Sequence, residues 1–253
     1  MKIIVGNWKM YPSQSAEAAA IAQASRRAVR GLKRTRVVVC PPFLYTDRIA
    51  KLAGERFAVG AQDCFWEDVG ARTGEVSAHM LAKIGATHVI IGHSERRALG
   101  ETDQDVAKKA AAAIKEKLTV IVCVGERDRD EAGSYFATVG AQVDAAFAGL
   151  SASAASRIIV AYEPIWAIGS QALRAATPED LHEMVVLIRK HLTRIFGKTP
   201  GFRIPILYGG SVDTENAAGY LAKGLADGLL IGRISLDKEK FAAIVRMADT
   251  LRA

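Results

Sequence analysis

Eight short runs of apolar residues recur along the chain, and each is followed by a longer stretch with helical spacing. The runs are rich in Val and Ile, and their apolar residues are consecutive rather than alternating. A strand of a parallel sheet that is covered on both faces has this pattern. The expected strands are Ile3–Gly6, Val37–Cys40, Phe57–Gly60, His88–Gly92, Val120–Val124, Ile158–Ala161, Ile204–Leu207 and Leu229–Ile231.

The clearest helix signal lies between the sixth and seventh runs. Thr177 is a favourable N-cap, Pro178 fits the first helical position and Asp180 complements the helix dipole. Apolar residues then recur every three or four positions, so one face of this helix should be buried. A second helix is expected to begin at residues 102–105, and the small residues of Ser151–Ser156 are expected to form a connection.

Strand and helix signals alternate eight times, with no break in composition and no linker between them. Alternation of this kind predicts an α/β fold with a parallel sheet. Eight units favour a (β/α)8 barrel that forms one domain over residues 1–253, and a doubly wound open sheet is the alternative. Ligands bind beyond the carboxyl ends of the strands in both folds, so the residues that follow each run are the candidates for chemistry.

The charge of the chain favours anionic partners. Of its 253 residues, 34 are Lys or Arg and 27 are Asp or Glu, for a formal charge of +7. No long basic run with interleaved aromatic residues occurs, so nucleic acid is not an expected partner. No run of about 18 apolar residues is present, and the apolar stretch after Met1 is too short for a secretory signal. We therefore expect no membrane association.

Cysteine usage and glycine spacing argue against metals and cofactors. Cys40, Cys64 and Cys123 are odd in number and widely spaced, which favours a reducing compartment and core positions for all three. No His, Cys and carboxylate cluster has the spacing of metal ligands. No glycine-rich segment has the spacing of a nucleotide-binding loop. We expect neither a metal nor an organic cofactor.

Three strand ends carry side chains suited to acid–base chemistry. Lys9, after the first run, can bring positive charge to an anionic substrate. His93, after the fourth, follows a glycine and should open a helical turn, where an imidazole tends to stay neutral and donate a hydrogen bond. Glu163 ends the sixth run among apolar residues, which suits a general base. Each could also be an ordinary strand-end residue when taken alone.

Glycines follow the last two runs. Gly209 and Gly210 come after the seventh run, and Gly232 comes after the eighth. Glycine allows backbone N–H groups to approach a phosphate closely, and the loops after strands seven and eight are the usual phosphate site of such barrels. A glycine pair is also common in plain turns, so this signal is weak by itself.

In combination, four segments resemble one family. They are GNWKM at residues 6–10, GHSERR at 92–97, AYEPIWAIG at 161–169 and YGGS at 208–211. Their order and their places at strand ends are similar to those of triosephosphate isomerases, and the resemblance covers essentially the whole chain. It implies a TIM barrel that interconverts dihydroxyacetone phosphate and glyceraldehyde 3-phosphate.

The resemblance also implies catalytic roles. Glu163 matches the base that moves a proton between adjacent carbons, and His93 matches the neutral group that polarises the carbonyl. Asn7 and Lys9 match residues that bind substrate oxygens and stabilise the enediolate. Glu95 matches a supporting carboxylate, and we include its neighbour Ser94 among the supporting residues.

Further residues match the phosphate site, the lid and the subunit contact. Gly169, Ser211 and Gly232 match residues whose backbone N–H groups bind phosphate. Ile168 and Leu230 match an apolar pair that clamps the base when the lid closes. The loop around Thr73 matches one that reaches into the partner of a homodimer. The implied setting is cytoplasmic glycolysis and gluconeogenesis.

Three segments depart from the family pattern. Residues 170–176 make the stretch after the lid about two residues longer, the loop after Arg97 is about one residue shorter, and Arg233 stands where a second glycine is usual. For Arg233 we expect a negative φ and a backbone contact to phosphate. An isomerase of four-carbon ketose phosphates and a non-catalytic phosphosugar-binding barrel are the alternative functions.

Overall fold

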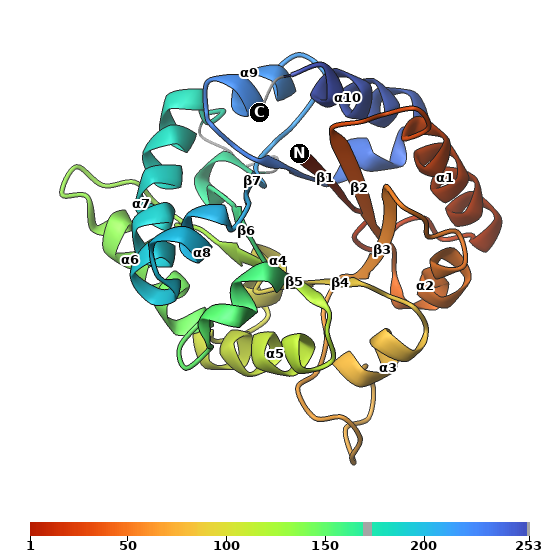
Figure 1. Cartoon of the computed structure of the whole chain (residues 1–253), viewed down its shortest axis with the longest axis horizontal. Helices are drawn as coiled ribbons and strands as arrows, with labels where there is room; N and C mark the ends of the chain where they lie inside the picture. Colours follow the sequence, from red (N-terminus) through yellow and green to blue (C-terminus); the bar gives the residue numbers. More distant parts are fainter. Residues whose placement is uncertain (169–173, 252–253) are drawn as a thin grey trace.

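The computed structural model describes residues 1–168 and 174–251, and its centre is a closed barrel of eight parallel strands (Figure 1). Each strand pairs with its neighbours in sequence, and β8 pairs with β1. The strands are β1 (Lys2–Asn7), β2 (Thr35–Cys40), β3 (Phe57–Ala61), β4 (His88–Ile91), β5 (Thr119–Val124), β6 (Ile158–Tyr162), β7 (Ile206–Tyr208) and β8 (Gly228–Ile231).

Helices form a ring around this barrel (Figure 1). No helix in the described part of the chain is both long and apolar enough to cross a membrane. The α-helices are α1 (Ser15–Ala28), α2 (Phe43–Ala50), α3 (Ala78–Lys83), α4 (Ser94–Ala98), α5 (Asp103–Lys115), α6 (Ser134–Ala146), α7 (Pro178–Phe196), α8 (Lys198–Arg203), α9 (Ala217–Ala222) and α10 (Lys238–Thr250). The 3₁₀ helices are η1 (Ala152–Arg157), η2 (Ile165–Ala167) and η3 (Arg233–Leu236).

The barrel predicted from the apolar runs is confirmed, and the open sheet is wrong because β8 closes onto β1. All eight runs form strands. The seventh begins at Ile206 rather than Ile204, after Pro205, which has no N–H to donate to a ladder. The Ser151–Ser156 connection forms most of η1.

The two predicted helix starts are also confirmed. The Thr177 side chain accepts from the N–H of Asp180, whose carboxylate accepts in turn from the N–H of Thr177. Thr102 and Asp105 form the same reciprocal pair at the start of α5. These capping boxes satisfy N–H groups that have no partner within the helix.

Alternate residues of the strands face two different apolar regions. One region is the inside of the barrel, and the other lies between the barrel and the helices. Ile4, for example, belongs to the outer region, whereas Val5 belongs to the inner one. Burial on both faces explains why the strands are continuously apolar. The inner region consists of Ile3, Val5, Val38, Cys40, Ile90, Ile121, Cys123, Ile159, Ala161, Leu207 and Leu230.

The closure of the barrel predicts that alanine destabilises the protein at one glycine, Gly228, and is tolerated at another, Gly54. A Cβ at Gly228 would lie 1.8 Å from the carbonyl oxygen of Ile3 on the neighbouring strand, whereas a Cβ at Gly54 would meet nothing within 4 Å. Gly228→Ala should therefore lower the free energy of unfolding by about 1–3 kcal/mol, as overpacking does. Gly54→Ala is the control and should change it by less than about 0.5 kcal/mol. Urea denaturation measures both, and equal losses would contradict this packing.

Candidate active site

A cavity of about 720 Å³ lies at the carboxyl ends of the strands. It brings together most of the residues that the sequence singled out, although they come from five different strand ends. Those residues are Asn7, Lys9, His93, Ser94, Glu95, Glu163, Ile168, Ser211, Leu230, Gly232 and Arg233.

Glu163 follows β6 directly and carries a buried carboxyl group. Its N–H donates to the carbonyl of Val124 at 2.8 Å, which continues the pairing of β5 with β6. The side chain is only 4% exposed, and its Oε1 lies 3.1 Å from Nε2 of His93. Its Oε2 accepts a hydrogen bond from the N–H of Ser94 at 2.9 Å. These contacts offset part of the cost of burying a carboxylate.

The absence of a side chain at Gly209 makes room for Glu163. A Cβ at Gly209 would lie 2.9 Å from Cγ of Glu163 and 3.6 Å from Cδ2 of Leu230. Gly209, the first of the two glycines after β7, therefore makes room for the Glu163 side chain. The sequence pattern predicts instead that both glycines lie at a phosphate site.

His93 is the N-cap of α4, as the sequence predicted. Its Nδ1 accepts a hydrogen bond from the N–H of Glu95 at 3.2 Å. A nitrogen that accepts carries no proton, so this contact assigns the proton of a neutral ring to Nε2. Nε2–H therefore faces the carboxylate of Glu163 and the cavity.

Lys9 has a backbone conformation that few residues other than glycine adopt, with φ of 53°. Its N–H donates to Oδ1 of Asn7 at 3.0 Å, and its carbonyl accepts from Nε2 of Gln62 at 2.8 Å. The same Gln62 nitrogen donates to the carbonyl of Cys40 at 2.9 Å. Nζ of Lys9 is 2.6 Å from Oε1 of Glu95. The sequence assigned no role to Gln62, which holds Lys9 in place.

The opposite side of the cavity is formed by the segments after β7 and β8. The Ser211 hydroxyl donates to the carbonyl of Ala167 at 3.0 Å and so ties these segments to the one after β6. Gly232 precedes η3, and Arg233 is the first residue of that helix, so its φ is negative as expected. The Arg233 side chain is exposed and lines the cavity, where its charge can attract an anion.

One predicted site residue does not line this cavity. Thr73 is exposed on the projecting loop between β3 and α3 (Figure 1), and it does not line the cavity. Gly169 lies outside the described residues.

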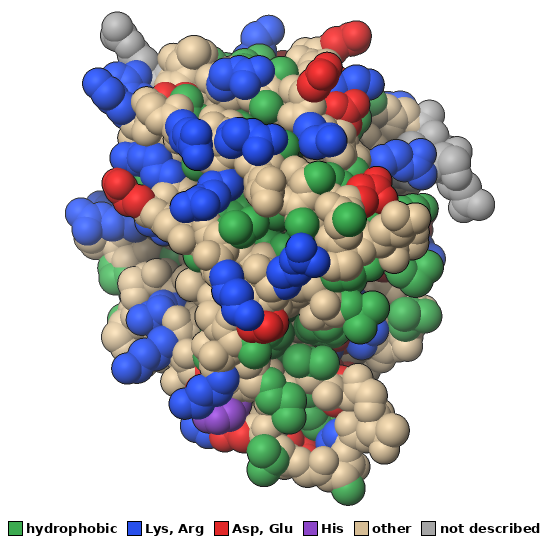
Figure 2. Space-filling view, turned by 90° about the vertical axis from the view of Figure 1, so that its right-hand side faces the viewer, with side chains coloured by type: hydrophobic (Ala, Val, Ile, Leu, Met, Phe, Trp, Pro, Cys, Tyr) green, Lys and Arg blue, Asp and Glu red, His purple; other side chains and the backbone are tan. Residues whose placement is uncertain are grey.

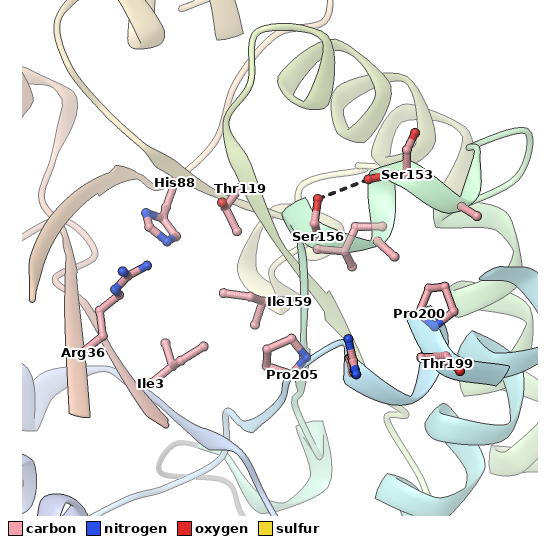
Figure 3. A pocket seen from close by; sticks show the side chains of 14 residues that line it. Ile3, Arg36, His88, Thr119, Ser153, Ser156, Ile159, Thr199, Pro200 and Pro205 are labelled. Carbon is pink, nitrogen blue, oxygen red and sulfur yellow. Dashed lines mark hydrogen bonds between the residues drawn. The ribbon is translucent and has the colours of Figure 1, made fainter. Parts of the chain in front are cut away.

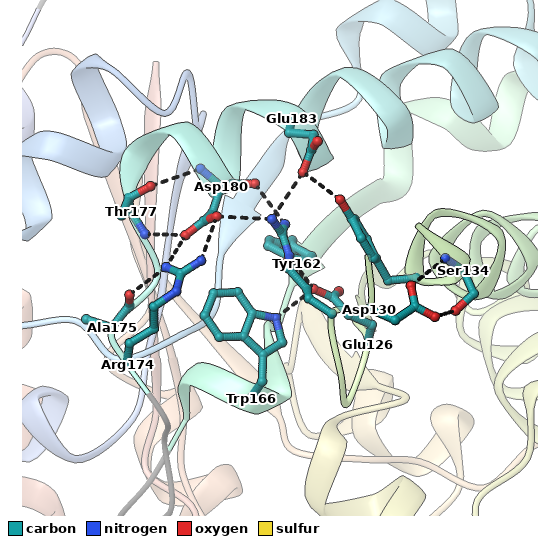
Figure 4. A network of polar contacts seen from close by, with 12 residues as sticks. Glu126, Asp130, Ser134, Tyr162, Trp166, Arg174, Ala175, Thr177, Asp180 and Glu183 are labelled. Carbon is teal, nitrogen blue, oxygen red and sulfur yellow. Dashed lines mark hydrogen bonds and ion pairs between the residues drawn. The ribbon is translucent and has the colours of Figure 1, made fainter. Parts of the chain in front are cut away.

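A polar network surrounds the base of the segment after β6 (Figure 4). Oε1 of the buried Glu126 accepts hydrogen bonds from the Tyr162 hydroxyl and from Nε1 of Trp166, both at 2.7 Å. Nε of Arg129 lies 3.2 Å from the same oxygen. Burial and, secondly, the charge of Glu126 raise the pKa of Tyr162, so its hydroxyl stays protonated and donates.

Arg174 extends this network on the far side of Trp166. Its guanidinium lies 4.5 Å from the centre of the Trp166 ring, and its Nη2 donates to Oδ1 of Asp180 at 3.0 Å. Asp180 also accepts from Nη1 of Arg129 at 3.0 Å. Both ends of the segment that contains residues 169–173 are therefore anchored on one cluster (Figure 4). The sequence did not reveal this cluster.

The cysteines are buried, as expected, and none forms a disulfide. Burial raises the pKa of Cys64 to about 12. Burial and, secondly, the charge of Glu163 raise the pKa of Cys123. Thiols in these settings are poor nucleophiles. Within residues 1–168 and 174–251, no group of three or more His, Cys, Asp and Glu side chains is placed to hold a metal ion.

Comparison with known proteins agrees with this geometry. The family described as triosephosphate isomerase matches residues 2–248. A triosephosphate isomerase of Moorella thermoacetica is 48% identical over 246 residues, which cover 96% of this chain and 97% of that protein. One from Citrifermentans bemidjiense is 42% identical over 250 residues, or 98% of each chain. The chain belongs to the triosephosphate isomerase family.

Proposed function

We propose that this chain interconverts dihydroxyacetone phosphate and glyceraldehyde 3-phosphate, a reaction of glycolysis and gluconeogenesis. The observation that carries the proposal is the meeting of Glu163, His93 and Lys9 in one cavity. Removal of a proton next to a carbonyl requires a base, and it requires donors at the oxygen that becomes negative. The three side chains supply both requirements.

Glu163 acts as the base. Its carboxylate takes the proton from the carbon next to the carbonyl and returns it to the former carbonyl carbon. A second proton moves from the hydroxyl oxygen to the former carbonyl oxygen. In the described structure, one oxygen of the carboxylate accepts from the N–H of Ser94 at 2.9 Å, and we propose that the carboxylate leaves this donor when it reaches the substrate. Because Gly209 has no side chain, the Glu163 side chain has room for this movement.

His93 and Lys9 stabilise the enediolate that forms between the two proton transfers. Nε2–H of His93 donates to the substrate oxygens, and the Lys9 ammonium group supplies positive charge beside Asn7. Glu95 is a supporting residue, because it positions both partners through its ion pair with Lys9 and its N–H bond to His93.

The segments after β6, β7 and β8 bind the phosphate group. Ser211 and Gly232 offer backbone N–H groups, and Arg233 adds charge at the rim. Ile168 and Leu230 close over the base and exclude water, which strengthens the electrostatic interactions inside.

The two alternative functions have less support. A barrel that only binds phosphosugars has no need of a buried carboxylate beside an imidazole. An isomerase of four-carbon substrates would use the same groups, but the relatives named above are triosephosphate isomerases. The proposed reaction needs no metal or organic cofactor, because side chains supply each chemical role.

A homodimer in the cytoplasm is the proposed state of the protein. Free buried cysteines are typical of reducing compartments. Hydrophobic side chains gather around the projecting loop at residues 61–77, in the lower half of Figure 2. Among the exposed large hydrophobic residues, Val69 lies on this loop and Met80 on α3, which follows it. Basic side chains are spread over the same face (Figure 2), and we propose neither nucleic acid nor membrane as a partner.

A coupled assay with glyceraldehyde 3-phosphate tests the reaction and the base together. The wild type should turn over this substrate faster than a four-carbon ketose phosphate. Glu163→Gln should lower kcat by about 10²–10⁴-fold, the usual contribution of a general base, and should retain binding of a phosphate inhibitor. Glu239→Gln, on the exposed face of α10, is the control and should retain full activity. Turnover like the wild type in Glu163→Gln would reject the role of base.

Arg233 should contribute through its charge. Arg233→Gln should raise KM about two- to fivefold, because an exposed ion pair contributes about 0.5–1 kcal/mol. It should also weaken the dependence of kcat/KM on salt concentration. Arg27→Gln, an exposed residue of α1, removes the same charge away from the cavity and should change neither quantity. If both variants behave alike, the Arg233 side chain does not contact substrate.

Light scattering should report a mass of at least twice 27.1 kDa at micromolar concentration. Val69→Asp places a charge on the projecting loop and should shift the protein towards monomer with loss of activity. Val186→Asp, on an exposed position of α7, is the control and should leave the mass unchanged. A fully active wild-type monomer at this concentration would contradict the proposal.

A further inference from the structure

A second cavity of about 530 Å³ lies at the other end of the barrel, where the strands begin (Figure 3). The first residues of several strands form one part of it, and η1 and α8 form the rest. None of the residues placed in the proposed reaction lines it. Its lining consists of Ile3, Arg36, His88, Thr119, Ala152, Ser153, Ala155, Ser156, Ile158, Ile159, Thr199, Pro200, Arg203 and Pro205.

The charged residues of this lining are all basic. Arg36 is half-buried and Arg203 is exposed, and no Asp or Glu lines the cavity with them. Neither arginine belongs to an ion pair with any residue in 1–168 or 174–251. Nearby Arg189, by contrast, lies 3.1 Å from Oδ2 of Asp227. The cavity therefore presents two positive charges that the described part of the protein does not neutralise.

His88 adds a polar group to the cavity without adding charge. Its Nδ1 lies 2.7 Å from the hydroxyl of Thr87, and the residue is buried. Burial and, secondly, the charge of Arg36 lower the pKa of His88 to about 4, so the ring is neutral at pH 7. A neutral ring can donate or accept a hydrogen bond.

The remaining lining combines apolar walls with hydroxyl groups. Ile3, Ile159 and Pro205 lie between Arg36 on one side and Pro200 on the other (Figure 3). Hydroxyls of Thr119, Thr199, Ser153 and Ser156 complete the lining, and the Ser156 hydroxyl donates to the carbonyl of Ser153 at 3.2 Å. A few polar groups on an apolar wall are typical of sites for small molecules, as is a volume in this range.

We propose that this cavity is a second binding site, specific for small organic anions. The positive charges of Arg36 and Arg203 attract the phosphate or carboxylate group of the ligand, and its apolar part packs against Ile3, Ile159 and Pro205. Arginine suits this role because its planar guanidinium can bind both oxygens of such a group. The inference does not depend on the proposed reaction, which uses the opposite end of the barrel.

Isoleucine methyl NMR with phenyl phosphate as the probe tests the proposal, because it separates the two cavities in one sample. Ile3 and Ile159 line the second cavity, whereas Ile234 lines the first. The Ile3 and Ile159 signals should shift saturably with phenyl phosphate, independently of any shift of Ile234. Phenol, which lacks the anion, and inorganic phosphate, which lacks the apolar part, should each bind at least about tenfold more weakly.

Substitution of the arginines identifies the contact. Arg36→Gln and Arg203→Gln should each weaken the binding reported by Ile3 and Ile159 by about tenfold, as expected for a lost charge-assisted hydrogen bond. Both should retain the wild-type response of Ile234, which shows that they are folded. Arg27→Gln is the control and should bind as the wild type does. Unshifted Ile3 and Ile159 signals, equal affinity in the arginine variants, or equal binding of phenol would overturn the proposal.

Discussion

The pairing of β8 with β1 is the interaction on which the rest of the structure depends. The N–H of Ile3 donates to the carbonyl of Asp227 at 3.0 Å, and Gly228 allows the two strands this close approach. Closure brings the ends of strands that are far apart in sequence to one place. Without it, Lys9 after β1 would lie at the edge of a sheet, away from Gly232 after β8. The candidate active site is therefore a consequence of the closed barrel.

Neighbouring residues hold the side chains of Lys9, His93 and Glu163 in place and leave each of them able to contact a substrate. Lys9 pairs with Glu95, which is exposed to solvent, so the lysine retains its charge for a substrate. His93 accepts a hydrogen bond on Nδ1, which directs Nε2–H into the cavity. The carboxylate of Glu163 is buried, and its two oxygens contact the N–H of Ser94 and Nε2 of His93. In the proposed mechanism, this arrangement places the base Glu163 and the oxyanion donor His93 side by side before a substrate arrives.

The strands and the two capped helices could be predicted because their signals are local. Burial on both faces gives continuous apolar runs, and Thr177 and Asp180 are only three residues apart. The hydrogen bond from Gln62 to Lys9 could not be predicted, because these residues are 53 positions apart and meet only through the register of three strands. The cluster at Glu126 and Trp166 and the cavity at the strand beginnings could not be predicted for the same reason. Side chains at strand ends suggested the chemistry, whereas their supporting contacts required the structure.

The imidazole of His93 presents a proton on Nε2 to the cavity, while its Nδ1 accepts from the N–H of Glu95. Nitrogen-15 NMR of the histidine side chains distinguishes the two nitrogens, with His93→Gln used to assign the signal. At pH 7 we expect Nε2 to have the chemical shift of a protonated nitrogen and Nδ1 that of an unprotonated one. A ring protonated on both nitrogens, or on Nδ1 alone, would contradict it.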